Sequence, residues 1–416
     1  MDFSVIRSTQ GLVPPSDPTP SGTMDLSVID RLAVLRCNAR TLHVFKQGPR
    51  AGAAQVLRKA LSKALVPYYP LAGRLKYSSQ GQLEIACSGD GVWLVEASAN
   101  CTLDAVNYFD DVMSIPHDML LPHHPPETEA IDPLVLIQVT QFACDGFVIG
   151  LVFCHSICDG LGAAQFLNAV GELARGLDLQ HLSVSPVWFR DFLPAPPPQE
   201  EACAIAPPPP ALPDYQLEHA NIDIPLHYIN QLKQEFRDNS MGQTCSAFEV
   251  VAASLWSRRT RAIKMDPNTE VKLVFFANCR QLLHPPLPKG FYGNCFFPVT
   301  IAASSETVAL GSNSDVVKLI QEAKATLPNE FAKWIKGELG VDPFAPPLLY
   351  TTLFISEWGR LGFNQIDYGW GTTSPCSSNT RLQHHTCWHC GVTAIANERY
   401  SFDDMVRPEG PSPSLS

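Results

Sequence analysis

Apolar residues recur along this chain at two spacings, one typical of helices and one typical of strands. Residues 54–66 carry them three and four positions apart, which predicts an amphipathic helix. Residues 134–142 and 147–154 are nearly continuous runs rich in Val, Ile and Phe, which predict buried strands. Asp145-Gly146 between them predicts a hairpin turn. The first half of the chain therefore mixes helices with strands.

A short polar stretch follows the second predicted strand. His155 stands where that strand ends, and Asp159-Gly160 follows shortly after it. Apolar residues then return at helical spacing and predict a helix of about four turns, at Ala163, Phe166, Val170, Leu173 and Leu177. His155 is therefore expected at the mouth of a strand, just before a helix.

The second half repeats this mixture, although we find no repeat at the level of residues. Ser246 followed three positions later by Glu249 is the pattern of a capping box, so a helix is predicted to begin there and to run to Ile263. Other stretches predict a further helix at 317–327 and strands at 272–277 and 348–356.

A proline-rich stretch at 194–213 separates the two halves. Such a run favours extended geometry and cannot enter the interior of a sheet. The sequence therefore predicts an N-terminal domain at 1–190, a linker at 191–214 and a C-terminal domain at 215–371. Residues 372–416 sustain neither the strand period nor the helix period, and we expect them to form an aberrant or alternative tail.

Composition fits this two-domain scheme. The 416 residues suffice for two cores, and 45% hydrophobic with 17% charged residues is typical of an ordered globular protein. The formal net charge of -11 argues against nucleic-acid binding, which needs a basic face. It does not exclude an anionic ligand, because a few local cations and helix N-termini can hold phosphates.

Several features of the sequence bear on the cellular compartment of the protein. No apolar run approaches the ~20 residues of a membrane span, and the N-terminus lacks the features of a secretory signal. The 13 Cys are scattered and odd in number, which predicts reduced thiols rather than a disulfide framework. We therefore expect a cytoplasmic protein that does not enter membranes.

His155 is the residue best suited to proton transfer. The free pKa of an imidazole lies close to neutral pH, so His155 could take a proton from a hydroxyl or a thiol. The alternative is a strand-end histidine held by hydrogen bonds. Asp159 could orient His155, or it could cap the next helix and pair with a buried arginine. We favour the second role, because the turn need not bring the two side chains together.

A second motif lies far downstream, at Asp367-Tyr368-Gly369-Trp370-Gly371. The two glycines permit backbone angles that other residues avoid, so Trp370 sits in a predicted tight turn. Its indole N–H could donate to an oxyanion, or the ring could simply pack against neighbouring side chains. Asp367 is most simply structural.

The two motifs together resemble the two signatures of the plant BAHD acyltransferases. Similar runs also occur at 25–31, 69–74, 290–295 and 353–358, and the resemblance ends at Gly371. It implies an α/β fold of two similar chloramphenicol-acetyltransferase-like domains. Each would be a mixed sheet flanked by helices, with a channel between the two domains.

The resemblance also implies an activity. BAHD enzymes move an acyl group from a coenzyme A thioester to an alcohol or amine, so acyl-CoA is the expected co-substrate and a small hydroxyl compound the expected acceptor. No permanently bound cofactor or metal is expected, and family members are mostly monomers. The motifs look most like those of grass p-coumaroyl-CoA:monolignol transferases, which implies an aromatic, hydroxycinnamoyl-type acyl group.

Individual roles follow from the same resemblance. His155 is the expected general base, with Trp370 as the second candidate catalytic residue. Asp159 is expected to point away from the acyl channel and to pair with Arg280. The remaining candidates are Gly160 and Asp367 as structural support and Ser246 and Ser356 near coenzyme A. Cys154 and Cys158 lie close to His155 in sequence, but we expect them to pack rather than act as nucleophiles.

The stretch 372–416 departs from the family, whose members continue with further strands and a helix. Loss of strands exposes sheet edges, and a fold is stable by only about 5–15 kcal/mol, so we expect a marginal, aggregation-prone or inactive protein. Cys387 and Cys390, with three histidines beside them, have zinc-like spacing. The surrounding sequence offers no ordered scaffold for a closed metal site, so none is expected.

Two other interpretations stay open. The chain could be a catalytically defective remnant that binds coenzyme A or a partner, and turnover of an acyl-CoA separates this case from the first. It could also be another His-x-x-x-Asp-Gly enzyme, such as a condensation domain or a chloramphenicol acetyltransferase relative. Neither of these explains the motif at 367–371.

Overall fold

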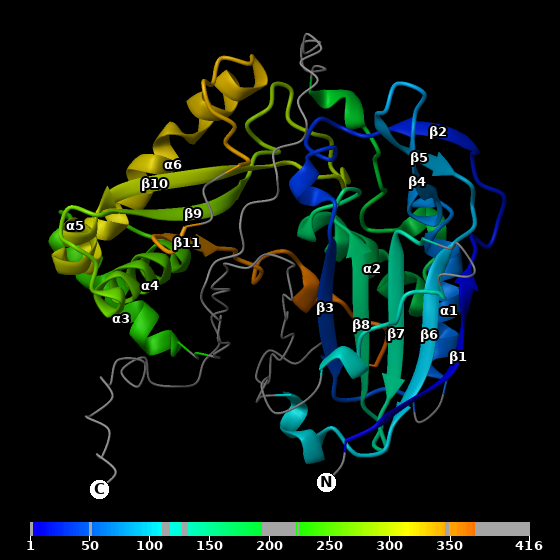
Figure 1. Cartoon of the computed structure of the whole chain (residues 1–416). Coiled ribbons are helices and arrows are strands. Elements are labelled where there is room, and N and C mark those ends of the chain that lie inside the picture. The colour runs from blue at the N-terminus through cyan, green and yellow to red at the C-terminus, as the bar shows by residue number, and fades with distance from the viewer. Residues whose placement is uncertain are drawn as a thin grey trace, which may run out of the picture. The chain divides into compact units, whose positions relative to one another are not determined.

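The computed structural model describes residues 3–49, 52–109, 117–126, 132–193, 222, 224–345 and 349–370. They form two compact units (Figure 1). Unit 1 contains the described residues up to 193 together with 278–296 and 358–370, and unit 2 contains those between 222 and 277 together with 297–357. The expected tail and most of the expected linker lie outside the described residues.

These units correct the expected domain boundaries in two places. Segments 278–296 and 358–370 were expected in the C-terminal domain, but they belong to unit 1. The reason is visible in their contacts: Arg280 pairs with Asp159, and a Cβ on Gly171 would meet the Asp367 carbonyl oxygen at 2.5 Å. A division of the sequence at its proline-rich stretch cannot detect that later segments fold back against unit 1.

Unit 1 is built around a five-stranded mixed sheet. Strand β8 pairs antiparallel with both of its neighbours, β7 and β3, whereas β6 pairs parallel with β7 and antiparallel with β1. The order is β1 (Val5–Val13), β6 (Val92–Ala99), β7 (Val135–Gln141), β8 (Phe147–Cys154) and β3 (Asn38–Phe45). A separate antiparallel sheet of three strands joins β2 (Gly22–Asp25), β5 (Leu83–Cys87) and β4 (Arg74–Tyr77).

Both faces of the five-stranded sheet are covered. Helices α1 (Ala53–Ala64) and α2 (Gly160–Ala174) pack together on one face (Figure 1). On the other face, side chains such as Leu42, Trp93 and Val148 form a core with Leu103 and others from the segment after β6. All eight residues of β8 are buried, which explains why its sequence is an apolar run without alternation.

Unit 2 has a smaller sheet with helices against it. Its strands are β10 (Phe296–Ser304), β9 (Glu270–Asn278) and β11 (Thr352–Ile355), with β11 parallel to β9. The helices are α3 (Leu226–Asn239), α4 (Ala247–Ile263), α5 (Ser305–Leu310) and α6 (Asn313–Ile335). Their apolar faces meet the strands in one core, in which Trp256 and Phe236 are fully buried.

The expected α/β fold class is confirmed, and so are the main predicted elements. The predicted helix at 54–66 is α1, and the predicted strands at 134–142 and 147–154 are β7 and β8. The predicted strand at 348–356 is shorter than expected among the described residues, at Thr352–Ile355. Within the described part of the chain, no helix is long and apolar enough to cross a membrane.

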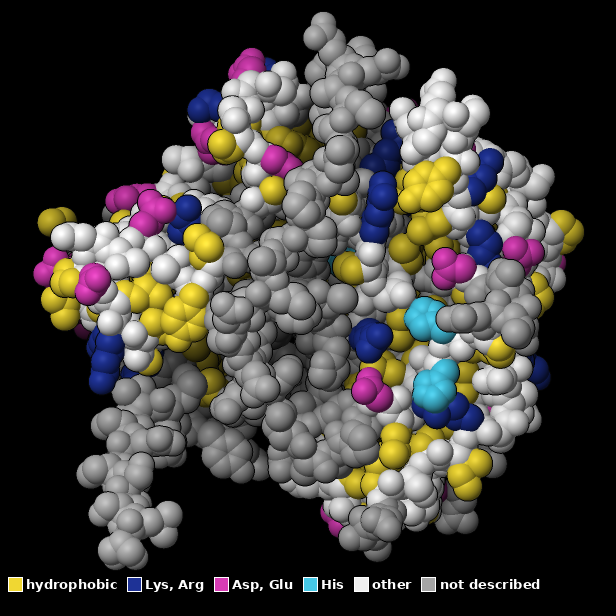
Figure 2. All heavy atoms as spheres, viewed as in Figure 1, with side chains coloured by type: hydrophobic (Ala, Val, Ile, Leu, Met, Phe, Trp, Pro, Cys, Tyr) yellow, Lys and Arg dark blue, Asp and Glu magenta, His cyan; other side chains and the backbone are white. Residues whose placement is uncertain are grey.

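The described surface carries both signs of charge. Lys and Arg side chains are interspersed with Asp and Glu over the face seen in Figure 2, and apolar side chains lie between them. On this face the two signs of charge are therefore mixed rather than separated.

Candidate active site

His155 directly follows β8, as the sequence predicted, and its backbone is held on both sides. Its N–H donates to the carbonyl oxygen of Cys37 at 2.9 Å, which continues the pairing of β8 with the start of β3. Its own carbonyl oxygen accepts from Asn294 Nδ2 at 2.8 Å. The residue that carries the candidate base therefore has a fixed main chain.

The imidazole of His155 is partly buried between aromatic rings. The ring centroids of Phe153 and Phe296 lie 6.1 Å and 6.2 Å from its own. Its Nδ1 is buried and makes no hydrogen bond with the other described residues. Nε2 is therefore the nitrogen left to meet a substrate.

Electrostatics keep His155 neutral near pH 7. Burial lowers the pKa of His155 below its usual value, since a charged imidazole loses hydration there. Its own backbone oxygen, the charge of Asp159, the Asn294 amide and the charge of Asp30 each raise that pKa in part. A neutral imidazole has the lone pair that a general base needs.

Asp159 supports the turn after His155 rather than the imidazole. It is the N-cap residue of α2, and its carboxylate accepts from the Gly162 N–H at 3.0 Å. Arg280 Nη2 lies 2.8 Å from both carboxylate oxygens, and the Cys295 N–H donates to Oδ2 at 3.3 Å. The cap and the arginine pair that we favoured from the sequence are therefore both present.

Two glycines let segments of unit 1 approach this turn closely. A Cβ on Gly162 would lie 1.9 Å from the Tyr292 carbonyl oxygen, which no side chain could tolerate. A Cβ on Gly293 would lie 1.2 Å from Arg190 Nη1. The first turn of α2 therefore packs directly against the backbone of the 290–295 run. Gly160, expected to support the site, starts α2 and faces Leu361.

Behind the His155 backbone lies a buried polar cluster, formed by Asp30, Arg190 and Asn294. All three side chains are buried, and Asp30 and Asn294 have no exposed surface. The sequence alone indicated no role for any of them, although Asp30 and Asn294 lie within runs that resemble the BAHD family. Only the fold shows that these runs meet beside His155.

The structure contradicts a catalytic role for Trp370. Its ring packs on Phe147 at the opposite end of β8 from His155, with centroids 5.5 Å apart and planes at 84°. At about 3.3 Å per residue, the eight residue steps from Phe147 to His155 separate these two ends by about 26 Å. An indole N–H cannot reach an oxyanion over that distance, so the packing alternative holds.

Asp367 has the structural role expected of it. Its carboxylate accepts from the Gly369 N–H at 2.8 Å and lies 3.6 Å from Arg175 Nη1. Gly369 has φ of +95°, a conformation that favours glycine. The motif therefore forms a turn that is anchored to the C-terminal end of α2.

The two expected coenzyme A residues lie in unit 2. Ser246 is the N-cap of α4, and the predicted capping box with Glu249 is complete. Ser356 follows β11, whose last residue Ile355 pairs with Phe275, and the Phe275 ring lies 5.1 Å from that of Phe248 in the first turn of α4. Both serines therefore lie at the same end of unit 2.

The cysteines near His155 are packing residues, as expected. Burial raises the pKa of Cys154 to about 11 and raises that of Cys158 well above its usual value. A thiol with a raised pKa stays protonated and is a poor nucleophile. The described residues include no group of three or more potential metal ligands, and the Cys387 and Cys390 motif lies outside them.

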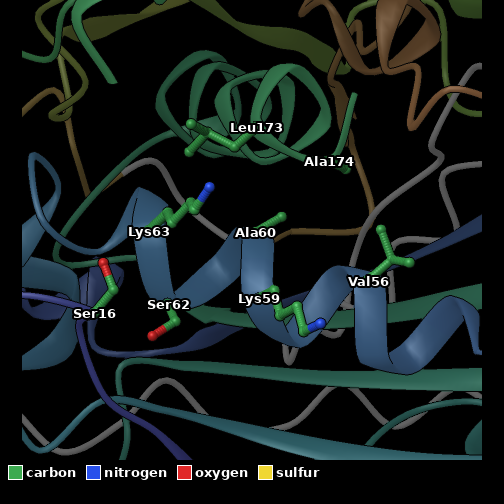
Figure 3. A pocket seen from close by; sticks show the side chains of 8 residues that line it. All are labelled: Ser16, Val56, Lys59, Ala60, Ser62, Lys63, Leu173 and Ala174. Carbon is green, nitrogen blue, oxygen red and sulfur yellow. The ribbon is translucent and has the colours of Figure 1, made fainter. Parts of the chain in front are cut away.

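A groove elsewhere in unit 1 is not part of this site. It lies between α1 and the end of α2, and its lining residues are shown in Figure 3: Ser16, Val56, Lys59, Ala60, Ser62, Lys63, Leu173 and Ala174. Leu173 and Ala174 are at the opposite end of α2 from Gly160. At 1.5 Å per residue, that helix keeps the groove about 20 Å from His155.

Comparison with known proteins agrees with this geometry. The model of the Transferase family matches residues 3–386. Acyl transferase 7 of Oryza sativa subsp. japonica is 45% identical over 404 residues, covering 92% of this chain and 90% of that protein. The chain belongs to the BAHD acyltransferase family. The family match continues to residue 386, so our expectation that the resemblance ends at Gly371 was wrong.

Two further similarities bear on activity and fold. The myricetin 3-O-glucosyl 1,2-rhamnoside 6'-O-caffeoyltransferase AT2 of Crocosmia x crocosmiiflora is 41% identical over 390 residues, covering 89% of this chain and 88% of that BAHD protein. The crystal structure of vinorine synthase matches with a TM-score of 0.64 at 23% identity, covering 89% of this chain and 87% of that one. The protein is therefore an acyltransferase with the BAHD fold.

Proposed function

We propose that this BAHD enzyme transfers a hydroxycinnamoyl-type acyl group from a coenzyme A thioester to a hydroxyl acceptor, with His155 as general base. The observation that carries the proposal is the position of His155, at the end of β8 with a fixed backbone and a neutral imidazole. The activity in the name of the caffeoyltransferase relative supports an aromatic acyl group, because caffeoyl is a hydroxycinnamoyl group.

The proposed reaction is a direct transfer. Nε2 of His155 takes the proton of the acceptor hydroxyl as its oxygen attacks the thioester carbonyl, which gives a tetrahedral intermediate. Collapse of the intermediate breaks the carbon–sulfur bond, and the imidazolium returns its proton to the departing thiolate. No covalent enzyme intermediate is needed, and the protonated state of Cys154 and Cys158 agrees with its absence.

Other residues of the proposal have supporting roles. Asp159 and Arg280 fix the turn that carries His155, and Ser246 and Ser356 are proposed to contact coenzyme A from unit 2. We further propose a cytoplasmic monomer. The indole of Trp370 has no part in this mechanism, so the donor to the oxyanion must be another group.

An acyl-transfer assay tests the proposal. Purified protein is offered p-coumaroyl-, feruloyl-, acetyl- and benzoyl-CoA with a panel of hydroxyl acceptors, and His155→Ala is compared with His181→Ala, whose histidine is exposed on a short 3-10 helix. We expect ester product, fastest with the two hydroxycinnamoyl donors, and a loss of about 10²–10⁴-fold in His155→Ala only.

Each other result has a definite meaning. Faster turnover of acetyl-CoA or benzoyl-CoA would contradict the proposed hydroxycinnamoyl-type acyl group. It would still agree with acyl transfer as the reaction class. Equal activity of His155→Ala and the wild type would remove His155 as the base. If well-folded protein forms no product with any donor and acceptor, the non-catalytic remnant becomes the better account.

A further inference from the structure

We propose that Asn294 is a positioning residue for His155, held in place by the buried ion pair of Asp30 and Arg190. This inference rests on the proposed function, because it takes His155 as the base. Asn294 does not touch substrate in this proposal. It acts through the backbone of the residue that does.

Asn294 links two groups through a single side-chain nitrogen. Its Nδ2 donates to the His155 carbonyl oxygen at 2.8 Å and to Asp30 Oδ1 at 2.7 Å, and its backbone N–H donates to the same Asp30 oxygen at 3.2 Å. Because Asn294 is fully buried, water does not compete for these bonds. The amide therefore has one orientation, with both donors committed.

Asp30 is in turn fixed by its own surroundings. Its other oxygen, Oδ2, accepts from the Ser27 N–H at 3.0 Å and lies 3.3 Å from Arg190 Nε. Both side chains of this ion pair are almost wholly inaccessible, with 0% of Asp30 and 1% of Arg190 exposed. A buried charge is stable only when it is paired, so Asp30 has little freedom to move away from Asn294.

Arg190 extends the cluster to the turn after His155. Its Nη2 donates to the carbonyl oxygen of Ile157 at 2.7 Å. Its guanidinium carbon lies 4.1 Å from the centre of the Trp188 ring and 5.1 Å from that of Phe291. The cluster therefore holds the carbonyl groups of His155 and Ile157 at once, from chain segments that are far apart in sequence.

The carbonyl oxygen of His155 matters to its imidazole. The interaction with its own backbone oxygen is the largest of the effects that raise the pKa of His155, and Nδ1 makes no hydrogen bond with the other described residues. A proton on Nδ1 that faces this oxygen leaves the lone pair on Nε2, which is the tautomer a base needs. Asn294 fixes the position of this oxygen, and we infer that it thereby favours this tautomer of the ring.

The groups around His155 determine whether its pKa should rise or fall when Asn294 is replaced. Asp159 and Asp30 raise the pKa of His155, and each is itself paired with an arginine, Arg280 and Arg190 respectively. The nearby thiols of Cys154 and Cys158 stay protonated, because burial raises their pKa values. The Asn294 amide also raises the pKa of His155, so its removal should lower that pKa further.

The matched pair of variants is Asn294→Ala and Asn168→Ala. Asn168 also donates through Nδ2 to two backbone carbonyls of unit 1, those of Ala164 and Gly362 at 2.8 Å and 3.1 Å, but it does not contact His155. We expect kcat of Asn294→Ala to fall by as much as about 100-fold, with little change in KM, because a misplaced base lowers the rate of the chemical step. The acidic limb of its kcat/KM profile should move to lower pH. Asn168→Ala should show neither effect.

A second readout does not depend on turnover. In protein with ¹⁵N-labelled histidine, the His155 signals are assigned by their loss in His155→Ala, and their tautomer and titration are followed by NMR. We expect the wild type to carry its proton on Nδ1, and Asn294→Ala to show a mixed tautomer and a lower pKa. If the wild type shows this tautomer and Asn294→Ala loses it, but the wild type forms no ester, the proposed function fails and the effect of Asn294 on the imidazole stands.

Two results would overturn the positioning role. One is equal loss of thermal stability in Asn294→Ala and Asn168→Ala, with the pH limb and the His155 tautomer unchanged in both. The other is a normal tautomer and pH limb in Asn294→Ser, the variant to use if Asn294→Ala does not fold. In either case Asn294 would be a structural residue only.

Discussion

Asp159 and His155 belong to one motif, yet their side chains have different partners. The carboxylate bonds to the N–H groups of Gly162 and Cys295 and to Arg280, with both members of the ion pair about nine-tenths buried. The imidazole receives only the field of that charge. At the scale of residues, the motif therefore combines a candidate general base, His155, with a residue that stabilises the turn, Asp159.

This difference predicts unequal effects of substitution. Asp159→Asn keeps the shape of the helix cap but leaves Arg280 without its counter-charge, so we expect the free energy of unfolding to fall by about 3 kcal/mol. The folded fraction should keep much of its activity, unlike that of His155→Ala. Thermal melts and acyl-transfer rates of both variants check this expectation.

A surface pair provides the control for Asp159→Asn. Asp25 lies 3.3 Å from Arg31 but is 79% exposed, so Asp25→Asn should cost no more than about 1 kcal/mol. If Asp159→Asn and His155→Ala lose activity equally at equal thermal stability, Asp159 acts in the chemistry and our assignment is wrong.

At the scale of elements, β8 decides which motif residues can act together. It carries His155 at its C-terminal end and contacts Trp370 through Phe147 at its other end. Helix α2 connects the same two ends in the opposite chain direction, since Asp159 caps its start and Arg175 near its end pairs with Asp367. The two motifs therefore fix opposite ends of the same strand–helix unit.

Trp370→Phe tests this separation. The change keeps an aromatic ring but removes the indole N–H, so we expect kcat and KM to stay unchanged. The loss of part of the contact with Phe147 should lower the free energy of unfolding by about 1 kcal/mol. A large fall in kcat with an unchanged melt would restore the oxyanion role that the geometry contradicts.

At the scale of the whole molecule, buried histidines make stability depend on pH. His43 in β3 is 1% exposed; its Nε2 lies 2.9 Å from Thr41 Oγ1 and its ring lies against Phe363. Burial lowers the pKa of His43 to about 3 from its usual 6.5. Because only the unfolded chain takes up this proton between those values, stability is full above pH 6.5 and falls as the pH drops.

Denaturant unfolding at pH 7 and pH 5 measures this effect. One such histidine lowers the free energy of unfolding by about 1.4 kcal/mol for each pH unit below 6.5. His43 alone should therefore lower it by about 2 kcal/mol at pH 5. His155 contributes with the same sign, since burial lowers its pKa too. His43→Gln should remove the larger part of the dependence, and an unchanged pH dependence in that variant would show that His43 titrates normally.

Local patterns predicted some elements well and others not at all. Helix α1 and strands β7 and β8 were found because their apolar residues are close in sequence and strongly patterned. Strand β1 was not, because VIRSTQGLV is largely polar and becomes a strand by pairing with β6, about 90 residues later. Pairing at that distance depends on the fold rather than on local propensity.

The sequence by itself determined the local order of the site: a strand, His155, the capping residue Asp159 and a helix. It also determined the family, because both motifs can be recognised from the amino-acid sequence alone. The tertiary structure decided the partners, since Arg280 and Asn294 meet this turn from 121 and 139 residues away. Resemblance suggested the first of these contacts, and nothing in the sequence suggested the second. The same structure removed Trp370 from the chemistry, because distance in space depends on how strands pair, and a motif does not encode that pairing.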